Sequence, residues 1–385
     1  MNPLFSKLPT TIFETMSALA REHDAINLGQ GFPELDGALD VRQVAARALV
    51  ERSNQYAPLL GLPELREAVA EHYGRLQGVT LDWRTEVAVT SGATEALAAA
   101  LLSLIAPGDE VVLLEPLYDA YLPLVLRAGG VPRFARLNAP DFRITESELS
   151  RVFSPKTRLV VLNTPANPSA RLHSAEELEL LADFCLRYDV IAVSDEVWEH
   201  VVLDGRQHQS LLALPRMRDR TVKVGSAGKM FALTGWKVGF VCADARLTQV
   251  VGKAHQFLTF ATPPNLQHAV AYGLGKPVDE LREMRRELTR SRDRLSSGLH
   301  DAGYATLPSE ATYFLNVDLA ASGLNVDDEV FCRRAVAEAG VAAIPLSAFY
   351  SEAPVRHLVR LCFAKTDATL DAGIARLAEA RRLFV

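Results

Sequence analysis

Lys229 lies three residues after the end of an apolar, strand-like run, Thr221–Ser226, in the middle of the chain. A lysine at the mouth of a sheet loses part of its hydration, which lowers the pKa of its amine and makes it a nucleophile toward carbonyl carbons. The segment does not match a Walker loop, because Lys223 stands where the first glycine belongs, or a nucleophile elbow, because Val224 replaces a glycine. Taken alone, a solvated loop lysine is the commoner reading.

Three other segments place polar groups just after strand-like runs. Ser91 and Thr94 open a helical stretch, where free backbone N–H groups and hydroxyls can hold a phosphate, although a simple helix cap reads the same way. Asp195 ends an apolar run and supplies an anion, or only a cap or an exposed carboxylate. The rigid segment Asn163–Pro168 is a turn with an amide side chain.

Arg360 lies in the run Leu358–Ala364, in which both alternating faces are otherwise apolar. We therefore expect Arg360 to be buried and to need an anionic partner. The carboxylate of a substrate fits the planar guanidinium, and a structural ion pair is the alternative.

These residues require a scaffold in which strands and helices alternate, and the sequence supplies that pattern. Such alternation predicts an α/β fold with a mainly parallel sheet covered on both faces, so the residues that follow the strands meet at one edge. Helical patterns at Ala93–Leu104 and Ala175–Tyr188 separate several of the strands. The predicted strands are Glu86–Thr90, Glu110–Glu115, Val131–Leu137, Arg158–Asn163, Val190–Asp195, Thr221–Ser226 and Lys237–Ala243.

The C-terminal part predicts a second, smaller α+β lobe, because 385 residues exceed what one core holds. We expect residues 1–44 to complete this small domain, residues 45–280 to form the large domain, and residues 281–385 to form the rest of the small domain. The elements expected in the C-terminal lobe are helices at Asp279–Leu299 and Asp327–Ala339 and strands at Thr312–Val317 and His357–Phe363.

Composition narrows the classes of function. Apolar residues make up 49%, charged residues 23%, and the net charge is −6, which predicts a packed protein without general affinity for nucleic acid or anionic membranes. No apolar run is long enough to cross a bilayer, and the start lacks the apolar core of a signal peptide. Four widely spaced cysteines indicate buried thiols in a reducing, cytoplasmic setting. We expect no catalytic metal, because no histidine cluster has ligand spacing, and no glycine-rich motif of a nicotinamide dehydrogenase is present.

Taken together and in order, the motifs resemble the fold-type I aminotransferases of class I/II, which depend on pyridoxal 5'-phosphate. The resemblance is strongest to the branch of kynurenine aminotransferases, glutamine transaminase K and bacterial methionine aminotransferases. It runs through nearly the whole chain, in the segments Asn27–Pro33, Asn54–Tyr56, Ser91–Leu97, Glu115–Tyr118, Asn163–Pro168, Ser194–Val197, Gly225–Lys229, Thr234–Gly239, Ala343–Pro345 and Arg360–Phe363.

The resemblance implies a role for each matching residue around the cofactor. Lys229 would hold pyridoxal phosphate as a Schiff base and later move the substrate proton. Asp195 would pair with the pyridine nitrogen, so that the ring can accept electrons. Tyr118 would stack on the ring, and Asn167 would bond its phenolic oxygen. The residues that would hold the phosphate are Gly92, Ala93, Thr94, Ser226 and Lys237.

The resemblance also implies a substrate site. Arg360 would bind the carboxylate of the amino acid or 2-oxo acid, with the Gly31 backbone and Asn167 close to it. Phe13 and Phe260 are expected in an apolar pocket for the substrate side chain, and Phe32, Phe257 and Tyr350 are further candidates for it. Tyr56 would reach the phosphate of a partner subunit, which implies a homodimer with active sites at its interface.

The sequence departs from the family pattern at three places. Trp198 stands three residues after Asp195, where relatives usually have a tyrosine, and an indole donates a hydrogen bond but accepts none. We expect Trp198 to lie against the cofactor as a donor or only as packing, leaving Asn167 as the main partner of the phenolic oxygen. Ser169 and Ala170 alter the usual turn, and Phe13 replaces a tryptophan of some relatives.

The resemblance thus predicts transfer of an amino group from an amino acid, with methionine, aromatic residues or glutamine favoured, to a 2-oxo acid. A cysteine-conjugate β-lyase on the same scaffold is the alternative, because its chemistry is shared up to deprotonation of the substrate. A non-catalytic regulator that senses the cofactor is a remote third reading, because the first forty residues are too few for a DNA-binding domain.

Overall fold

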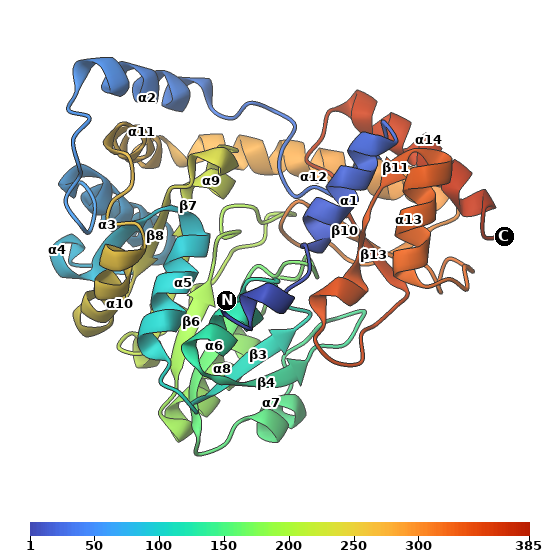
Figure 1. The fold of residues 1–385 in the computed structure, drawn as a ribbon. Helices are drawn as coiled ribbons and strands as arrows, with labels where there is room; N and C mark the ends of the chain where they lie inside the picture. The colour runs from blue at the N-terminus through green and yellow to red at the C-terminus, as the bar shows by residue number, and fades with distance from the viewer.

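A seven-stranded sheet forms the centre of the larger part of the molecule, which we describe from a computed structural model of residues 1–385 (Figure 1). The strand order is β2-β8-β7-β6-β5-β3-β4, and all neighbours are parallel except β8, which runs antiparallel to both β2 and β7. The predicted mainly parallel sheet is confirmed. Its strands are β2 (Val87–Thr90), β3 (Glu110–Glu115), β4 (Val131–Arg136), β5 (Thr157–Asn163), β6 (Ile191–Asp195), β7 (Thr221–Ser226) and β8 (Gly239–Cys242).

Helices cover both faces of this sheet (Figure 1). In α8 (Ala175–Tyr188) a capping box joins Ser174 and Glu177 at the start, and the buried Leu178, Leu181 and Cys185 share the stripe that faces the core. The other helices of this part are α2 (Leu39–Glu51), α3 (Pro63–Gln77), α4 (Trp83–Glu86), α5 (Gly92–Leu104), α6 (Tyr121–Ala128), α7 (Glu146–Val152), α10 (Ala245–Leu258) and α11 (Pro264–Leu274).

A four-stranded antiparallel sheet, in the order β12-β13-β10-β9, forms the centre of the smaller part. The N-terminal segment joins this part, because β1 (Ile26–Asn27) pairs in parallel with β11 (Val341–Ala342), and Figure 1 shows α1 beside α13. Its other elements are α1 (Ile12–Glu22), β9 (Ala305–Thr306), β10 (Phe314–Asp318), α13 (Asp328–Ala339), β12 (Ile344–Pro345), β13 (Leu358–Cys362) and α14 (Asp367–Arg382).

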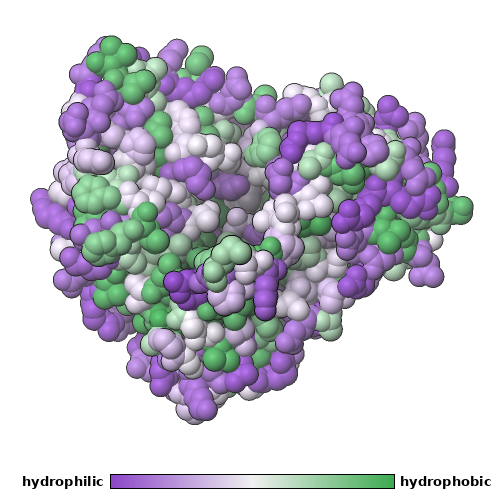
Figure 2. Space-filling view, in the orientation of Figure 1, coloured by the Kyte–Doolittle hydropathy of each residue, from purple (hydrophilic) through white to green (hydrophobic).

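Two helices cross the domain boundaries expected from the sequence. Residue 44 lies inside α2, which packs on α11 of the larger part, and residue 280 lies inside α12 (Val278–Asp301), which runs from one part to the other. Figure 2 shows the surface hollowed near the middle of the visible face, with apolar and hydrophilic residues around the hollow. No helix combines the length and the apolar character that a membrane span requires.

The last predicted strand begins two residues too early. Lys237 has φ of 55°, in the left-handed region, and β8 starts only at Gly239. The turn before β8 directs Lys237 toward the start of α5 instead of into the sheet, as its contacts below show.

Candidate active site

A cavity of about 220 Å³ lies where the parallel strands of the large sheet end. It is lined by residues from β6, β7, the loop after β5 and the first turns of α5 and α6, which the topology brings to one edge. Ten of the residues predicted for the site line this single cavity: Gly92, Ala93, Thr94, Tyr118, Asn167, Asp195, Trp198, Ser226, Lys229 and Lys237.

The first turn of α5 and Lys237 form a cradle for an anion on one side of the cavity. Gly92 has φ of +78°, and a Cβ atom there would lie 3.0 Å from the Cε atom of Lys237. At Gly239 a Cβ would lie 2.7 Å from the backbone of Gly92. The Nζ atom of Lys237 lies 3.5 Å from Oγ1 of Thr94. Backbone N–H groups at a helix start, a hydroxyl and an ammonium together suit a phosphate group.

Lys229 lies in α9 (Ala227–Met230), the short helix after β7, and its amine points into the cavity. Nζ donates a hydrogen bond to the carbonyl oxygen of Gly31 at 3.3 Å and lies 4.4 Å from the centre of the Trp198 ring. Desolvation lowers the pKa of Lys229 to about 8, and the nearby Arg360 acts in the same direction. A substantial fraction of this amine is therefore neutral near physiological pH and able to attack a carbonyl carbon.

Asp195 ends β6 and is buried at the cavity floor. Desolvation raises the pKa of its carboxyl to about 6, although the hydroxyl of Tyr121 donates a hydrogen bond to Oδ2 at 2.6 Å and the backbone N–H of Val197 donates at 3.3 Å. Asp195 makes no ion pair within the chain. A buried carboxylate without a cation is a suitable partner for a protonated ring nitrogen.

Tyr121 is a site residue that our sequence analysis missed. It lies one turn after Tyr118, in the first turn of α6, and the two rings meet edge to face at 5.7 Å. A second tyrosine three residues after Tyr118 was the available signal, because the turn that leads into α6 brings the two rings into contact.

Arg360 lies in β13 and is 1% exposed, so its expected burial is confirmed. Its guanidinium donates to the side-chain oxygen of Asn167 at 2.6 Å and to the carbonyl of Gly29 at 3.1 Å, while its Nε has no partner. No carboxylate of the chain forms an ion pair with it, so the structure of the chain does not supply the structural ion pair that was the alternative. Burial lowers the pKa of Arg360 to about 9, which the charge of a bound carboxylate would reverse.

Three aromatic rings surround the guanidinium of Arg360. Its Cζ lies 3.8 Å from the ring centre of Phe314, 5.1 Å from that of Phe13 and 5.3 Å from that of Phe349. A Cβ added at Gly31 would lie 2.7 Å from the ring of Phe314, so only glycine leaves this space open. The N–H groups of Arg360 that have no partner are therefore surrounded by aromatic rings.

Four other aromatic candidates lie away from the cavity. Tyr56 is 84% exposed and meets Phe260, which is 42% exposed, edge to face at 5.5 Å. Phe257 is also largely exposed, and Phe32 packs beside Lys365. None of these four lines the cavity within one chain. The resemblance implied that Tyr56 reaches a partner subunit, whereas Phe32, Phe257 and Phe260 were expected in the substrate pocket of their own chain, where the structure does not place them.

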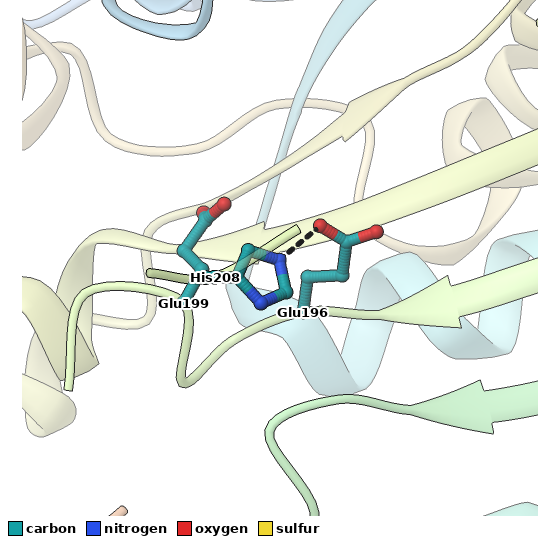
Figure 3. A group of neighbouring side chains, drawn as sticks. All are labelled: Glu196, Glu199 and His208. Carbon is teal, nitrogen blue, oxygen red and sulfur yellow. Dashed lines mark hydrogen bonds and ion pairs between the residues drawn. The ribbon is translucent and has the colours of Figure 1, made fainter. Parts of the chain in front are cut away.

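A second group of charges lies behind the turn that follows Asp195, and Figure 3 shows three of its members, Glu196, Glu199 and His208. The ammonium of Lys223, inside β7, bonds to carboxylate oxygens of both Glu196 and Glu199, and Nε2 of His208 lies 2.7 Å from Glu196. Two carboxylates and an imidazole converge as metal ligands do. In this chain the ammonium already occupies the position between the carboxylates, so we interpret the group as a structural ion cluster.

The family of the chain follows from comparison with known proteins. Residues 23–377 match the model of aminotransferase class I and II. The chain belongs to this family. It is 42% identical over 381 residues to the methionine aminotransferase of Escherichia coli, covering 98% of both chains, and 36% identical over 388 residues to human kynurenine–oxoglutarate transaminase 1, covering 92% of both.

Solved structures give the same result for this aminotransferase. The methionine aminotransferase of Escherichia coli superimposes with a TM-score of 0.95 at 41% identity, covering 98% of this chain and 99% of the other. The N-succinyldiaminopimelate aminotransferase of Mycobacterium tuberculosis also gives 0.95 at 41% identity, covering 99% and 100%. The protein is a transaminase of fold type I, and its cofactor is pyridoxal 5'-phosphate.

The cavity of this aminotransferase fits that cofactor chemically. The α5 cradle has donors for a phosphate, Asp195 is a buried carboxylate without a cation, and Lys229 has an amine of lowered pKa. Each of the three features matches one chemical group of pyridoxal phosphate: its phosphate, its pyridine nitrogen and its aldehyde.

Proposed function

We propose that the residues of the 220 Å³ cavity hold pyridoxal phosphate and carry out the transamination. The observation that carries this proposal is that one cavity contains both the buried carboxylate of Asp195 and the Lys229 amine, whose pKa is lowered to about 8. When bound, the cofactor supplies an aldehyde that accepts the amino group and a ring that takes up the electrons left by deprotonation at Cα.

The residues of the chain bind, orient and move protons around that group. The Nζ atom of Lys229 would take the proton from Cα of the substrate and return it to the carbon that the aldehyde of the cofactor contributes. Asp195 would keep the ring nitrogen protonated, and the Tyr121 hydroxyl holds that carboxylate in place. Tyr118 would lie over the ring and Asn167 would bond its oxygen, while Gly92, Ala93, Thr94, Ser226 and Lys237, which line the same cavity, would hold the phosphate.

Arg360 binds the α-carboxylate of the substrate, because it is the buried cation that has spare donors and no ion pair. The rings of Phe13, Phe314 and Phe349 around it favour an amino donor with an apolar or aromatic side chain. The names of the relatives, methionine aminotransferase and kynurenine–oxoglutarate transaminase, agree with such a donor. Glutamine, a predicted donor as well, is the polar member of the set.

The active unit that we propose is a homodimer. Large apolar side chains are exposed together near the start of the large domain and at the end of α10, and a second copy of the chain would cover them. In that dimer Tyr56 and Phe260 complete the site of the partner subunit. The exposed residues in question are Leu49, Val50, Tyr56, Phe257, Leu258 and Phe260.

We also propose a division into two domains and a location in the cell. The small domain contains the N-terminal segment up to the start of α2 and the residues after α12, and α12 is shared by both domains. Four free cysteines, all buried, support the cytoplasm, where thiols stay reduced.

A panel of amino donors against several 2-oxo acids tests the substrate proposal. We expect kcat/KM for methionine and phenylalanine to exceed that for aspartate by at least about tenfold, since a carboxylate in an apolar pocket stays unpaired. A preference for aspartate would contradict the apolar pocket. N-succinyl-diaminopimelate belongs in the panel because a relative is named for it. Pyruvate released from a cysteine conjugate without an acceptor would instead indicate the β-lyase reaction.

Mixing two inactive variants tests the shared site. If Tyr56 acts across the interface, each site combines Lys229 of one subunit with Tyr56 of the other. In a mixed dimer of Tyr56→Phe and Lys229→Ala subunits, one site then carries both substitutions and the other site carries neither. We expect activity to return after the two proteins are refolded together, and not after either is refolded alone. Mixed dimers without recovered activity would show that Tyr56 acts within its own subunit or not at all.

A further inference from the structure

The indole of Trp198 lies against the amine of Lys229. Nζ is 4.4 Å from the ring centre, within the distance of about 6 Å at which an aromatic face attracts a cation. The ring is 3% exposed and is fixed by edge contacts with Tyr313 at 4.8 Å and with Phe314 at 5.4 Å. It cannot turn away without displacing both neighbours.

The other contact of the amine is a backbone carbonyl. Nζ donates a hydrogen bond to the oxygen of Gly31 at 3.3 Å, so both a carbonyl oxygen and an indole face contact the amine. Both groups stabilise an ammonium more than a neutral amine, because the carbonyl oxygen accepts a hydrogen bond from it and the indole presents the negative side of its ring quadrupole.

The titratable groups that face Lys229 come from three other segments. Asp195 belongs to β6, Arg360 and Cys362 to β13, and Lys237 to the turn before β8. Asp195 is the only carboxylate among them, and the Tyr121 hydroxyl bonds it. No ion pair therefore compensates an ammonium at Lys229, and the indole is the aromatic face available to it.

We propose that Trp198 is the binding face for the ammonium of Lys229, and that its ring sets how readily this amine holds a proton while it is not bound to the cofactor. The functional consequence rests on the proposed role of Lys229. Nζ gains one proton from Cα of the substrate and becomes a cation, the indole face stabilises that cation, and the proton then leaves for the acceptor carbon. Trp198 thus acts through its ring, whereas the tyrosine usual in the family offers a hydroxyl.

The test uses apoenzyme labelled with 5-fluorotryptophan, which gives three ¹⁹F signals because the chain has three tryptophans. Trp198→Phe identifies its signal. We expect that signal to shift with pH around a midpoint near the lowered pKa of Lys229, about 8, and the shift to disappear in Lys229→Met. A flat Trp198 signal, or a titration that persists in Lys229→Met, would overturn the proposal.

Trp83 is the matched control inside the same molecule. The guanidinium of Arg84 lies 4.4 Å from its ring, the same separation as for Lys229 and Trp198, but arginine stays charged over the whole range. The Trp83 signal should not move between pH 6 and 10. A parallel shift of both signals would indicate a general change of the protein and would contradict the assignment to Lys229.

A second measurement follows the lysine itself in apoenzyme carrying ¹³C-methylated lysines, with Lys229→Arg used to identify its signal. Trp198→Leu removes the aromatic face and should lower the titration midpoint of Lys229 by roughly one pH unit. Trp198→Phe should lower it by less, because a benzene ring still attracts a cation, although more weakly than indole. Equal midpoints in parent and Trp198→Leu would refute the role of the ring. Both titrations are independent of turnover, so a failure of the catalytic role of Lys229 would leave their outcome unaffected.

Discussion

Two groups of enclosed charges lie on opposite sides of the turn after β6, and they differ in whether the chain supplies their partners. Behind the turn, the ammonium of Lys223 bonds to both Glu196 and Glu199. Burial alone would raise the pKa of each carboxyl, yet Lys223, with the neighbouring histidines, lowers both to about 2. These carboxylates therefore stay charged at any physiological pH, and the chain itself supplies their cation.

In front of the turn, each charge lacks its partner. Burial raises the pKa of Asp195 to about 6 and lowers that of Lys229 to about 8 and that of Arg360 to about 9, so all three move toward the neutral form. The difference teaches that burial does not by itself mark a functional charge. An enclosed charge that the fold leaves unpaired marks the place of a ligand group of opposite charge.

The largest expected effect is on catalysis in front of the turn. Lys229→Ala removes the proton carrier and should lower kcat/KM by about 10⁴-fold or more, as expected for loss of a general base that is also a nucleophile. Bound cofactor should lose the visible absorption of its bond to lysine. The free energy of unfolding of the apoenzyme should change little, because the amine has no ion pair. Turnover near the parent rate would show that another lysine reacts.

Behind the turn the largest effect should be on stability. Lys223→Met removes the ammonium that bonds to both buried carboxylates and should lower the free energy of unfolding by about 3–5 kcal/mol, measured in urea, whereas Lys229→Met should not. The pKa of Glu196 is lowered in the fold from its ordinary 4.5 to about 2, so its stabilisation is complete above pH 4.5 and is lost as the pH falls toward 2. The deficit of Lys223→Met should shrink over the same interval. An equal deficit at pH 3 and pH 7 would contradict this account.

Much of the fold could be predicted because its signals are local. Most strands of the large sheet are short apolar runs followed by turn residues, and the apolar stripes of the helices repeat within one element. Arg360 was recognised as buried because it interrupts such a run. The same argument applies to Lys223, between Val222 and Val224, and would have found the second cluster. We had used Lys223 only to reject a phosphate-loop motif.

The rest depends on packing between distant segments. No local pattern brings Tyr121 to Asp195, 74 residues further along, or surrounds Arg360 with Phe13 and Phe314. Resemblance to the family supplied the residues of the site, but the contact between Trp198 and Lys229 lies where this chain departs from the family pattern. Such a contact has to be read from the structure.

Arg360 gives the next prediction on the cavity side. Arg360→Ala should lower kcat/KM by about 10²–10³-fold for both amino acids and 2-oxo acids, since it removes a buried charged contact to the carboxylate, and should leave the visible absorption intact. Arg66 is a matched control, because it is also buried but bonds only to the carbonyls of Val87 and Arg84. Arg66→Ala should reduce stability without changing substrate preference. Unchanged kinetics in Arg360→Ala would assign it a structural role.

The smallest expected effect compares two buried tyrosine hydroxyls, one on each side of the turn. Tyr121 donates to Asp195 at 2.6 Å, and Tyr73 donates to Glu199 at 2.7 Å. The first bond opposes the rise in the pKa of Asp195, so Tyr121→Phe should raise that pKa further, by roughly one unit for a hydrogen bond to a charged group. Cofactor affinity requires the ionised carboxylate and falls as the pH drops through this pKa.

The midpoint of cofactor affinity against pH, measured by titrating apoenzyme with pyridoxal phosphate, should therefore move upward in Tyr121→Phe, with kcat/KM reduced about tenfold at pH 7. Tyr73→Phe loses an equivalent bond to a carboxylate that Lys223 already neutralises, so it should lower the free energy of unfolding by about 1 kcal/mol and leave the midpoint unchanged. If both variants moved the midpoint equally, charges on the two sides of the turn would be coupled, and the distinction between satisfied and unsatisfied clusters would fail. If neither moved it, Asp195 would not be the partner of the cofactor ring.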